Sequence, residues 1–383
     1  MKKEDISALK TSIDRLEKKK SNIYFYLPNT QQIAVSIWET YFVASVLKSE
    51  GYSTFILTDD EKYEKPFFVE DNLRQIDTIY PKENTLSVRA SDFIVIPDYF
   101  KDVLGFVKDL PAKKIIWVSS VSSLLLNHTS NMQFRANFNV SSFLVSSEKL
   151  ANLIRSCFMA ESSAYSFNII EPTIPKYFEE AKTIHKKPII GFVSRNSDMI
   201  KLIATIFYKR YPIFQWVTFE PLANLKREDF AKKLGESTLS VWIDEVSTFG
   251  TFPFESIAAG TYPIMVRSKI NDNHFEFWKK NDNLTMGSFA QNFISMEKES
   301  NGKFNDVPEK IFETLVYFLL NDVSSSYTEK LSWNTETMES YVKPIMDGAE
   351  KRKKITNAFK NIFGERINEL KKIQTNIQNE SKK

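Results

Sequence analysis

The sequence predicts an α/β protein with two doubly wound domains and a helical C-terminal extension. Its 383 residues suffice for two hydrophobic cores of ordinary domain size. Hydrophobic residues make up 42% of the chain and charged residues 26%, a balance that is typical of a globular protein. In both halves, short and nearly continuous apolar runs alternate with segments of helical periodicity. This is the pattern of parallel strands that helices cover on both faces.

The first half of the chain predicts an N-terminal helix and the first domain. The charged segment 1–20 carries apolar residues at helical spacing, and we expect a surface or dimer-contact helix there. The N-terminal domain is predicted over 21–167, and it opens with a strand, a helix that stops at Gly51 and a second strand, which make a β-α-β unit. Its expected elements are strands at 23–27, 54–57, 92–97, 114–118 and 142–145, with helices at 33–50 and 148–158.

The second half repeats the alternation after a break. Residues 168–187 contain prolines and little periodicity, and we interpret them as the linker between the domains. The C-terminal domain is predicted over 188–330, followed by C-terminal helices over 331–383. Its expected elements are strands at 188–193, 215–219, 239–243 and 262–266, with helices at 198–208, 227–234 and 255–259.

Composition argues against several classes of protein. A net charge of +3 disfavours a nucleic-acid surface dominated by charge. No apolar run approaches the roughly 20 residues of a membrane span, and the first residues do not lead into a signal-peptide core, so we expect no integral membrane association. The single cysteine, Cys157, fits a reducing compartment, and we expect a cytoplasmic protein. The adjacent Lys113 and Lys114 are expected to lie on a solvated face.

The sequence also lacks the common cofactor and metal motifs. Its ten glycines include no G-x-G-x-x-G and no P-loop. The three histidines, His128, His185 and His274, are widely separated, and with one cysteine they do not make a zinc site. No Asp-x-Asp triplet occurs. We therefore expect neither a cofactor nor a metal ion.

The most informative stretch is the strand, loop and helix between Ser240 and Ile264. A short apolar strand leads into a loop with Gly250, and a helix follows whose first turn carries the carboxylate of Glu255 and which stops at Gly260. Glycine permits close approach of a ligand to the backbone, and the N–H groups of a loop-to-helix junction suit phosphate or ribose hydroxyls. By pattern alone, an ordinary strand–helix connection capped by glycine is the simpler interpretation.

This stretch resembles the donor-binding segment of the family-four retaining glycosyltransferases, which have the GT-B fold. That family reads Glu-Gly-Phe-Gly, four residues, Glu, and then Ala-x-Ala-x-Gly-x-Pro-Val. Ser247 stands where the family has its first Glu, and Glu245 lies two residues earlier, so the resemblance implies nucleotide contacts more directly than sugar contacts. The residues in register are Phe249, Gly250, Glu255, Ala258, Gly260 and Thr261.

The start of the C-terminal domain resembles the same family. There the family has Gly-Arg at the end of a strand and a Lys about one helical turn later. Here Ser194 and Arg195 end the strand, and Lys201 lies one residue beyond the usual Lys. The resemblance implies that Arg195 and Lys201 bind the donor diphosphate, because charge-assisted hydrogen bonds stabilise the charge that develops on it as it leaves. It also implies that Arg195 and Glu255 are catalytic. An exposed arginine in a helix-capping loop is the alternative.

The resemblance assigns roles to the other candidate residues as well. Glu255 would accept hydrogen bonds from the ribose hydroxyls, and Gly250 and Thr251 would offer backbone N–H groups. Phe249 and Ser247 complete the expected donor site. Asn29 and Thr30 lie in the loop where the family has Gly-Gly. Sugar or acceptor contacts are expected from four polar residues in segments that match less closely: Asn29, Thr30, His128 and Glu245.

The whole resemblance implies a glycosyltransferase with two Rossmann-like domains facing across a cleft. The acceptor would bind to domain 21–167, and a nucleotide-diphosphate sugar, most readily a UDP-sugar, to domain 188–330. The expected reaction is metal-independent hexosyl transfer with retention, to a glycan, a protein or a modified DNA base. The alternatives are a non-catalytic partner subunit with the same fold and a sugar-nucleotide epimerase. A further expectation is an assembly, either a homodimer or a complex with another glycosyltransferase.

Overall fold

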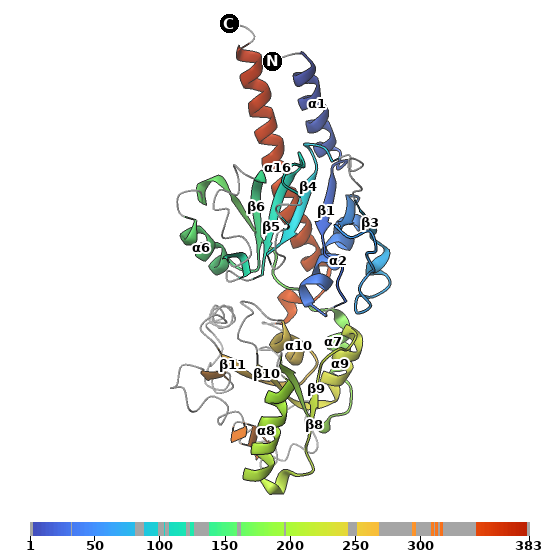
Figure 1. Cartoon of the computed structure of the whole chain (residues 1–383), viewed down its shortest axis with the longest axis vertical. Helices are drawn as coiled ribbons and strands as arrows, with labels where there is room; N and C mark the ends of the chain where they lie inside the picture. The colour runs from blue at the N-terminus through green and yellow to red at the C-terminus, as the bar shows by residue number, and fades with distance from the viewer. Residues whose placement is uncertain are drawn as a thin grey trace. The chain divides into compact units, whose positions relative to one another are not determined.

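The computed structural model of the chain divides into two compact units. The first unit comprises Met1–Glu171 together with Arg352–Lys383, and the second comprises Pro172–Lys351 (Figure 1). The structure describes the following residues: 3–31, 33–80, 88–98, 103, 107–119, 123–125, 138–158, 162–194, 197–243, 251–267, 293–295, 308–309, 311–312, 315–316 and 342–380.

The first unit is built on a seven-stranded sheet whose order is β3-β2-β1-β4-β5-β6-β7. All of its strand pairings are parallel. The chain adds β2 and β3 on one side of β1 and then returns to place β4 on the other side, which makes the sheet doubly wound. The strands are β1 Asn22–Tyr26, β2 Ser53–Leu57, β3 Asp77–Ile79, β4 Phe93–Pro97, β5 Lys113–Val118, β6 Val140–Val145 and β7 Ser166–Ile169.

Helices cover both faces of this sheet. Side chains alternate along β1, so that Phe25 faces one core and Tyr24 the other. Helices α1, α2 and α16 pack in the first of these cores and α6 in the second. The bounds are α1 Lys3–Glu17, α2 Val35–Ser49, α6 Glu148–Cys157 and α16 Ala349–Glu380, with single 3-10 turns at η1 Leu73–Gln75 and η2 Ser162–Ala164.

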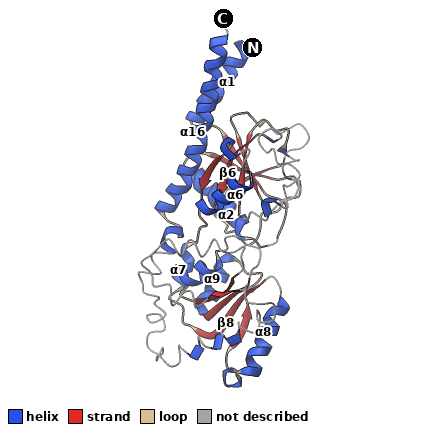
Figure 2. Cartoon of the chain, turned by 90° about the vertical axis from the view of Figure 1, so that its left-hand side faces the viewer, coloured by secondary structure: helices blue, strands red, loops and turns tan. Residues whose placement is uncertain are grey.

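The last helix, α16, belongs to the first unit from Arg352 onward, although the sequence placed it in a separate C-terminal segment. Although its sequence is highly charged, α16 carries apolar residues along one face. Of these, Phe359 and Leu370 are almost fully buried in the same core as β1. Beyond the sheet, α16 runs beside α1, which both views show (Figure 2). The Lys371 ammonium pairs with the Glu17 carboxylate at 2.8 Å and joins the two helices.

The second unit has a five-stranded parallel sheet in the order β12-β11-β10-β8-β9. Helix α8 packs against one face, and α7, α9 and α10 pack against the other. The elements are α7 Lys176–Ala181, β8 Lys187–Ser194, α8 Ser197–Arg210, η3 Pro212–Phe214, β9 Thr218–Pro221, α9 Arg227–Glu236, β10 Ser237–Ile243, α10 Phe252–Ala258, β11 Tyr262–Arg267, β12 Phe293–Ser295 and η5 Lys343–Ile345.

Three local expectations differ from the structure. The range 168–187 contains the end of β7 and helix α7, so it is more than a linker. The strand expected at 215–219 begins only at Thr218, because Pro212 starts a 3-10 turn just before it. Lys113 and Lys114 are buried in β5, where the Lys114 ammonium donates hydrogen bonds to backbone carbonyls. Burial lowers the pKa of Lys114 to about 8.

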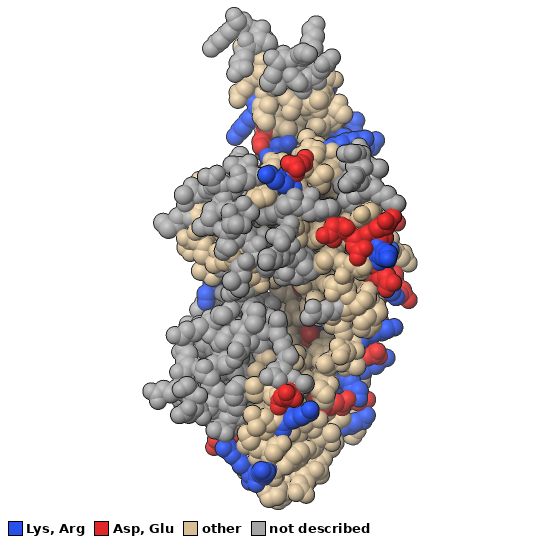
Figure 3. Space-filling model, viewed as in Figure 1, with Lys and Arg blue, Asp and Glu red and all other residues tan. Residues whose placement is uncertain are grey.

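The described surface carries both signs of charge. On the face drawn in Figure 3, basic and acidic side chains are interspersed, which agrees with the small net charge. No helix in the described part of the chain combines the length and the apolar character needed to cross a bilayer.

Candidate functional site

The sheet of the second unit reverses its winding direction at β8. From β8 the chain moves to β9 on one side, and it then returns to place β10 on the other side. Ser194 at the end of β8 pairs with Ile243 at the end of β10. The connections that follow these two residues lead to α8 and α10. At such a switch point adjacent connections diverge, and α/β proteins bind ligands in the opening that results.

Several of the candidate residues belong to these two connections. Arg195 follows Ser194 directly, and the stretch that begins after Ile243 continues to Thr251. The strand pairing therefore starts the two predicted donor segments from neighbouring backbone positions. The candidates that lie outside the described residues are Arg195, Glu245, Ser247, Phe249, Gly250 and, in the first unit, His128.

Thr251 stands at the N-cap of α10 and is described. Its side chain is buried, and the Thr251 Oγ1 atom has no hydrogen-bond partner among the described residues. The backbone N–H of Glu255 donates to the Thr251 carbonyl at 2.9 Å, which closes the first helical turn. A buried hydroxyl normally has a partner, so the Thr251 hydroxyl is an unsatisfied polar group at the start of α10.

Glu255 is buried and paired, which the sequence did not predict. Its side chain is 2% exposed, and its Oε1 accepts a hydrogen bond from Nη2 of Arg227, whose side chain is 7% exposed. Arg227 is the first residue of α9, and its guanidinium lies over the ring of Phe178 in α7, 5.3 Å from the centroid. The pair thus joins three helices. No spacing rule marks Arg227 as a partner, because 28 residues separate it from Glu255.

The far end of α10 is held by a lysine that sequence reasoning also missed. Lys186 Nζ donates to the Ala259 carbonyl at 3.1 Å and to Thr261 Oγ1 at 2.8 Å. Gly260 lies between these two acceptors with φ +67°, the left-handed conformation that ends a helix. Burial lowers the pKa of Lys186 to about 7. Together with Arg227 and Glu255, these contacts fix the position of α10.

Lys201 occupies an exposed position in the first half of α8. Its side chain is 80% exposed, and its ammonium lies 3.7 Å from an oxygen of Asp198 on the same helix. A surface pair of this kind contributes little to stability, so Lys201 can reorient toward a ligand at small cost.

The first unit has its own switch point, between β1 and β4. Asn29 follows β1, but its side chain is engaged: Nδ2 donates to Asp60 Oδ2 at 2.7 Å and to the Lys62 carbonyl, and Oδ1 accepts from the Glu64 N–H. The hydrogen bond from Asn29 is the main cause that lowers the pKa of Asp60. Thr30, next in the chain, is half-buried. Asn29 therefore shapes this loop.

A buried carboxylate, that of Asp98, also lies at the carboxyl edge of the sheet in the first unit. Asp98 follows β4 directly, is fully buried, and accepts hydrogen bonds from the backbone N–H and hydroxyl of Ser119, both at 2.9 Å. These bonds tie the ends of β4 and β5 together. Among the described residues, no group of three or more His, Cys, Asp and Glu side chains is arranged to hold a metal ion.

Comparison with known proteins finds similarity in structure but not in sequence. The sequence matches no family model and none of the curated proteins. Sucrose-phosphate synthase from Thermosynechococcus elongatus superposes with a TM-score of 0.59 at 12% identity, over 90% of this chain and 99% of that one. The pneumococcal O-GlcNAc transferase GtfA, solved with UDP and GlcNAc, gives 0.54 at 10% identity, over 90% and 99%.

A third structure supports the same fold. The α-glucosyltransferase AGT in complex with UDP superposes with a TM-score of 0.53 at 8% identity, over 88% of this chain and 98% of that one. These proteins share the two parallel-sheet domains of the GT-B fold. The chain therefore has the GT-B fold with a helical C-terminal segment, which confirms the fold class expected from the sequence.

Proposed function

We propose that the chain is a glycosyltransferase that takes a sugar from a nucleotide-diphosphate sugar, with a UDP-sugar as donor. The observation that carries this proposal is the pairing of Ser194 with Ile243, because it starts both donor-like segments side by side at a switch point. The fold adds support, since two structures that share it were solved with UDP. The second unit is then the donor domain, and the first is the acceptor domain.

Each candidate residue has a defined part in this proposal. Arg195 neutralises the leaving diphosphate, and Lys201 reorients to assist it. The backbone N–H groups of Gly250 and Thr251 and the Thr251 hydroxyl bind the diphosphate or the sugar. Glu255 accepts from the ribose. Arg227 positions Glu255 by holding one of its carboxylate oxygens.

The finer features of the reaction rest mainly on the family-four resemblance. They are retention of configuration, hexosyl transfer and independence of a metal ion, the last of which also agrees with the missing Asp-x-Asp triplet. The acceptor is a glycan, a protein or a modified DNA base, and we place its contacts in the first unit. The proposed location of the protein is the cytoplasm. Its proposed assembly is a homodimer or a complex with another glycosyltransferase.

Nucleotide binding tests the proposal directly. Thermal unfolding of the whole chain is followed while UDP and other nucleoside diphosphates are added. A ligand that binds only the folded protein raises the midpoint temperature. At a ligand concentration of a hundred times its Kd, it adds about 2.7 kcal/mol to the free energy of unfolding. Arg195→Ala should lose most of this rise, whereas Lys360→Ala, a change at an exposed position of α16, should keep it. The proposal fails when no nucleotide shifts the wild-type midpoint.

Turnover separates the proposed activity from its alternatives. Labelled UDP-sugars are incubated with the protein and with glycan, protein or DNA acceptors. Transfer to one acceptor class supports the transferase. Conversion of the donor sugar without an acceptor identifies an epimerase. UDP binding with no turnover, together with co-purification of an active homologue, identifies a partner subunit.

A further inference from the structure

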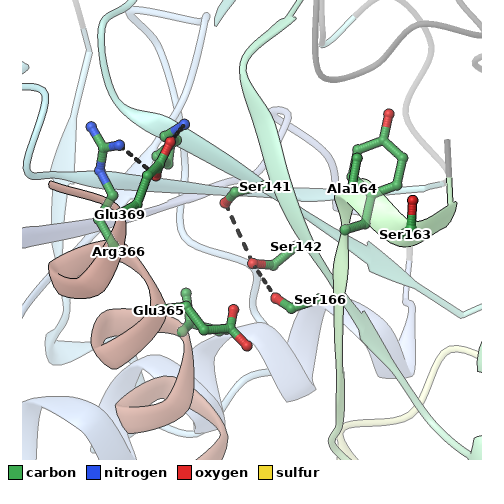
Figure 4. A pocket seen from close by; sticks show the side chains of 11 residues that line it. Ser141, Ser142, Ser163, Ala164, Ser166, Glu365, Arg366 and Glu369 are labelled. Carbon is green, nitrogen blue, oxygen red and sulfur yellow. Dashed lines mark hydrogen bonds and ion pairs between the residues drawn. The ribbon is translucent and has the colours of Figure 1, made fainter. Parts of the chain in front are cut away.

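A polar cavity of about 300 Å³ lies in the first unit, and none of the donor-site candidates lines it. It is lined by the amino-terminal part of the strands β5, β6 and β7 and by one side of α16 (Figure 4). In a parallel sheet all carboxyl ends meet at one edge and all amino ends at the other. The cavity is therefore at the edge opposite to the switch point between β1 and β4, and it is separate from the proposed donor site, which belongs to the second unit.

A row of serine hydroxyls forms one wall of this cavity. Ser166 Oγ donates to Ser142 Oγ at 2.9 Å, Ser142 Oγ donates to Ser141 Oγ at 3.4 Å, and Ser141 Oγ donates to the Lys114 carbonyl at 3.4 Å. In each of these hydrogen bonds the serine farther along the row from the Lys114 carbonyl is the donor. The lone pairs of Ser166, the first hydroxyl of the row, are left to accept a hydrogen bond from a ligand.

The charged side chains of the opposite wall leave a second acceptor. Glu369 binds both cations of the cavity, Lys113 at 3.1 Å and Arg366 at 2.6 Å. Burial favours a higher pKa for Glu369, but hydrogen bonds and attraction from Arg366 and Lys113 outweigh it and lower the pKa. Glu365 has no ion pair among the described residues, and Figure 4 shows its carboxylate turned from α16 toward the side of Ser142 and Ser166.

These features select the chemistry of a ligand. Lys113 and Arg366 bring two positive charges to the cavity and Glu369 and Glu365 two negative ones, so the cavity has no net positive charge to attract a phosphate or nucleotide. Ser166 and Glu365, which is exposed at the rim of the cavity, can both accept hydrogen bonds from a ligand. A volume of about 300 Å³ is at the lower end of the range for small-molecule sites, which extends to about 1,000 Å³. A neutral, compact molecule with several hydroxyl groups meets all three conditions.

The geometry points to a carbohydrate-binding site in this cavity, which holds one sugar residue through hydroxyl groups that donate to Ser166 and Glu365. The site is distinct from the proposed donor site. A sugar bound here is therefore not the sugar of the donor. The cavity would instead anchor a glycan chain or a free sugar at the far edge of the first unit.

Binding of methyl glycosides to the whole protein tests this inference. Methyl glucoside, galactoside, mannoside and N-acetylglucosaminide are titrated, and saturation-transfer NMR follows binding. Glu365→Gln removes a charge-assisted hydrogen bond and should weaken binding by about 10- to 100-fold. Ser166→Ala should weaken it by less. Glu350→Gln, the same chemical change at an exposed position in the first turn of α16, is the matched control and should bind as the wild type does.

Three outcomes overturn the inference. One is that no glycoside binds the wild-type protein. Another is that a glycoside binds the wild type, Glu365→Gln and Ser166→Ala equally well. The third is that putrescine, a diamine, binds with the same dependence on Glu365 while every glycoside fails, because the cavity is then a cation site. Glu365→Gln should retain the wild-type response to UDP, so failure here and failure of the proposed function are told apart.

Discussion

At the scale of single residues, the buried pair of Arg227 and Glu255 has the largest consequence for the candidate site. Both side chains are less than one tenth exposed. A charge held in such a place is costly unless its partner is present, so each residue requires the other. The pair fixes the Glu255 carboxylate in the first turn of α10, one turn from Thr251.

Removing one member of the pair should be much worse than removing both. Arg227→Met leaves a buried carboxylate alone and should lower the free energy of unfolding by about 3–5 kcal/mol. The double variant Arg227→Met with Glu255→Gln should recover a large part of this loss. Urea unfolding measures both values. Lys201→Met, which breaks an exposed pair, should change stability by no more than about 0.5 kcal/mol. An Arg227→Met effect as small as that of Lys201→Met would contradict the buried pair.

Lys186 predicts how stability depends on pH. Its pKa falls from the ordinary 10.5 to about 7 in the folded protein because of burial. Between these values the unfolded chain binds more protons than the folded one, so the free energy of unfolding contributed by Lys186 rises with pH. The slope is at most about 1.4 kcal/mol per pH unit.

Urea unfolding at a series of pH values checks this slope. Lys186→Met should flatten the rise in stability between about pH 7 and pH 10, because the titrating group is gone. Lys232→Met, at an exposed position of α9, should leave the rise as it is. Parallel curves for the wild type and Lys186→Met would show that Lys186 keeps an ordinary pKa.

At the scale of elements, close helix packing holds α10 in place. Helix α9 approaches α7 at Gly235, where an added Cβ would lie 2.5 Å from the Ala181 carbonyl oxygen. The same packing of α9 on α7 brings Arg227, the first residue of α9, over the ring of Phe178 in α7. A glycine here is required by packing and not by backbone conformation.

Two glycine-to-alanine changes in helices should therefore have opposite signs. Gly235→Ala should destabilise the protein by about 1–3 kcal/mol through overpacking. Gly364→Ala in α16, where nothing lies within 4 Å of an added Cβ, should stabilise it by up to about 1 kcal/mol, because alanine is the better helix former. Thermal unfolding compares the two. Stabilisation by Gly235→Ala would show that α7 and α9 lie farther apart than described here.

At the scale of the whole molecule, the chain passes twice between its two units. It leaves the first unit after Glu171 and returns at Arg352, so α16 completes the core that β1 and α2 began. Each unit has a sheet with its own switch point. We propose that the donor binds to the second unit. A measurement on the intact chain can therefore show which of the two units binds the nucleotide.

Hydrogen exchange locates the nucleotide. UDP should slow amide exchange in peptides that cover α10 and the carboxyl ends of β8 and β10, since a ligand that binds the folded state suppresses local opening. Peptides from β1 to β7 should change little. Arg195→Ala should abolish the effect. Protection confined to the first unit would move the donor site there.

Much of the fold was predictable because its signals are local. The strand expected at 54–57 is observed at Ser53–Leu57, and the helix expected at 148–158 is observed at Glu148–Cys157. Strand β3 was missed because it is short and only partly buried. The end of α10 at Gly260 was also read correctly, since glycine at a helix end has a local cause.

The sequence by itself determined the alternation of strands and helices and the two-domain architecture, since burial and periodicity are properties of neighbouring residues. Only the tertiary structure decided which side chains meet. Arg227 and Glu255 are 28 residues apart, and Lys113 and Glu369 are 256 apart, and neither pair leaves a pattern in the chain. The physical reason is that a pairwise contact depends on how elements pack in space, and packing is a property of the whole fold.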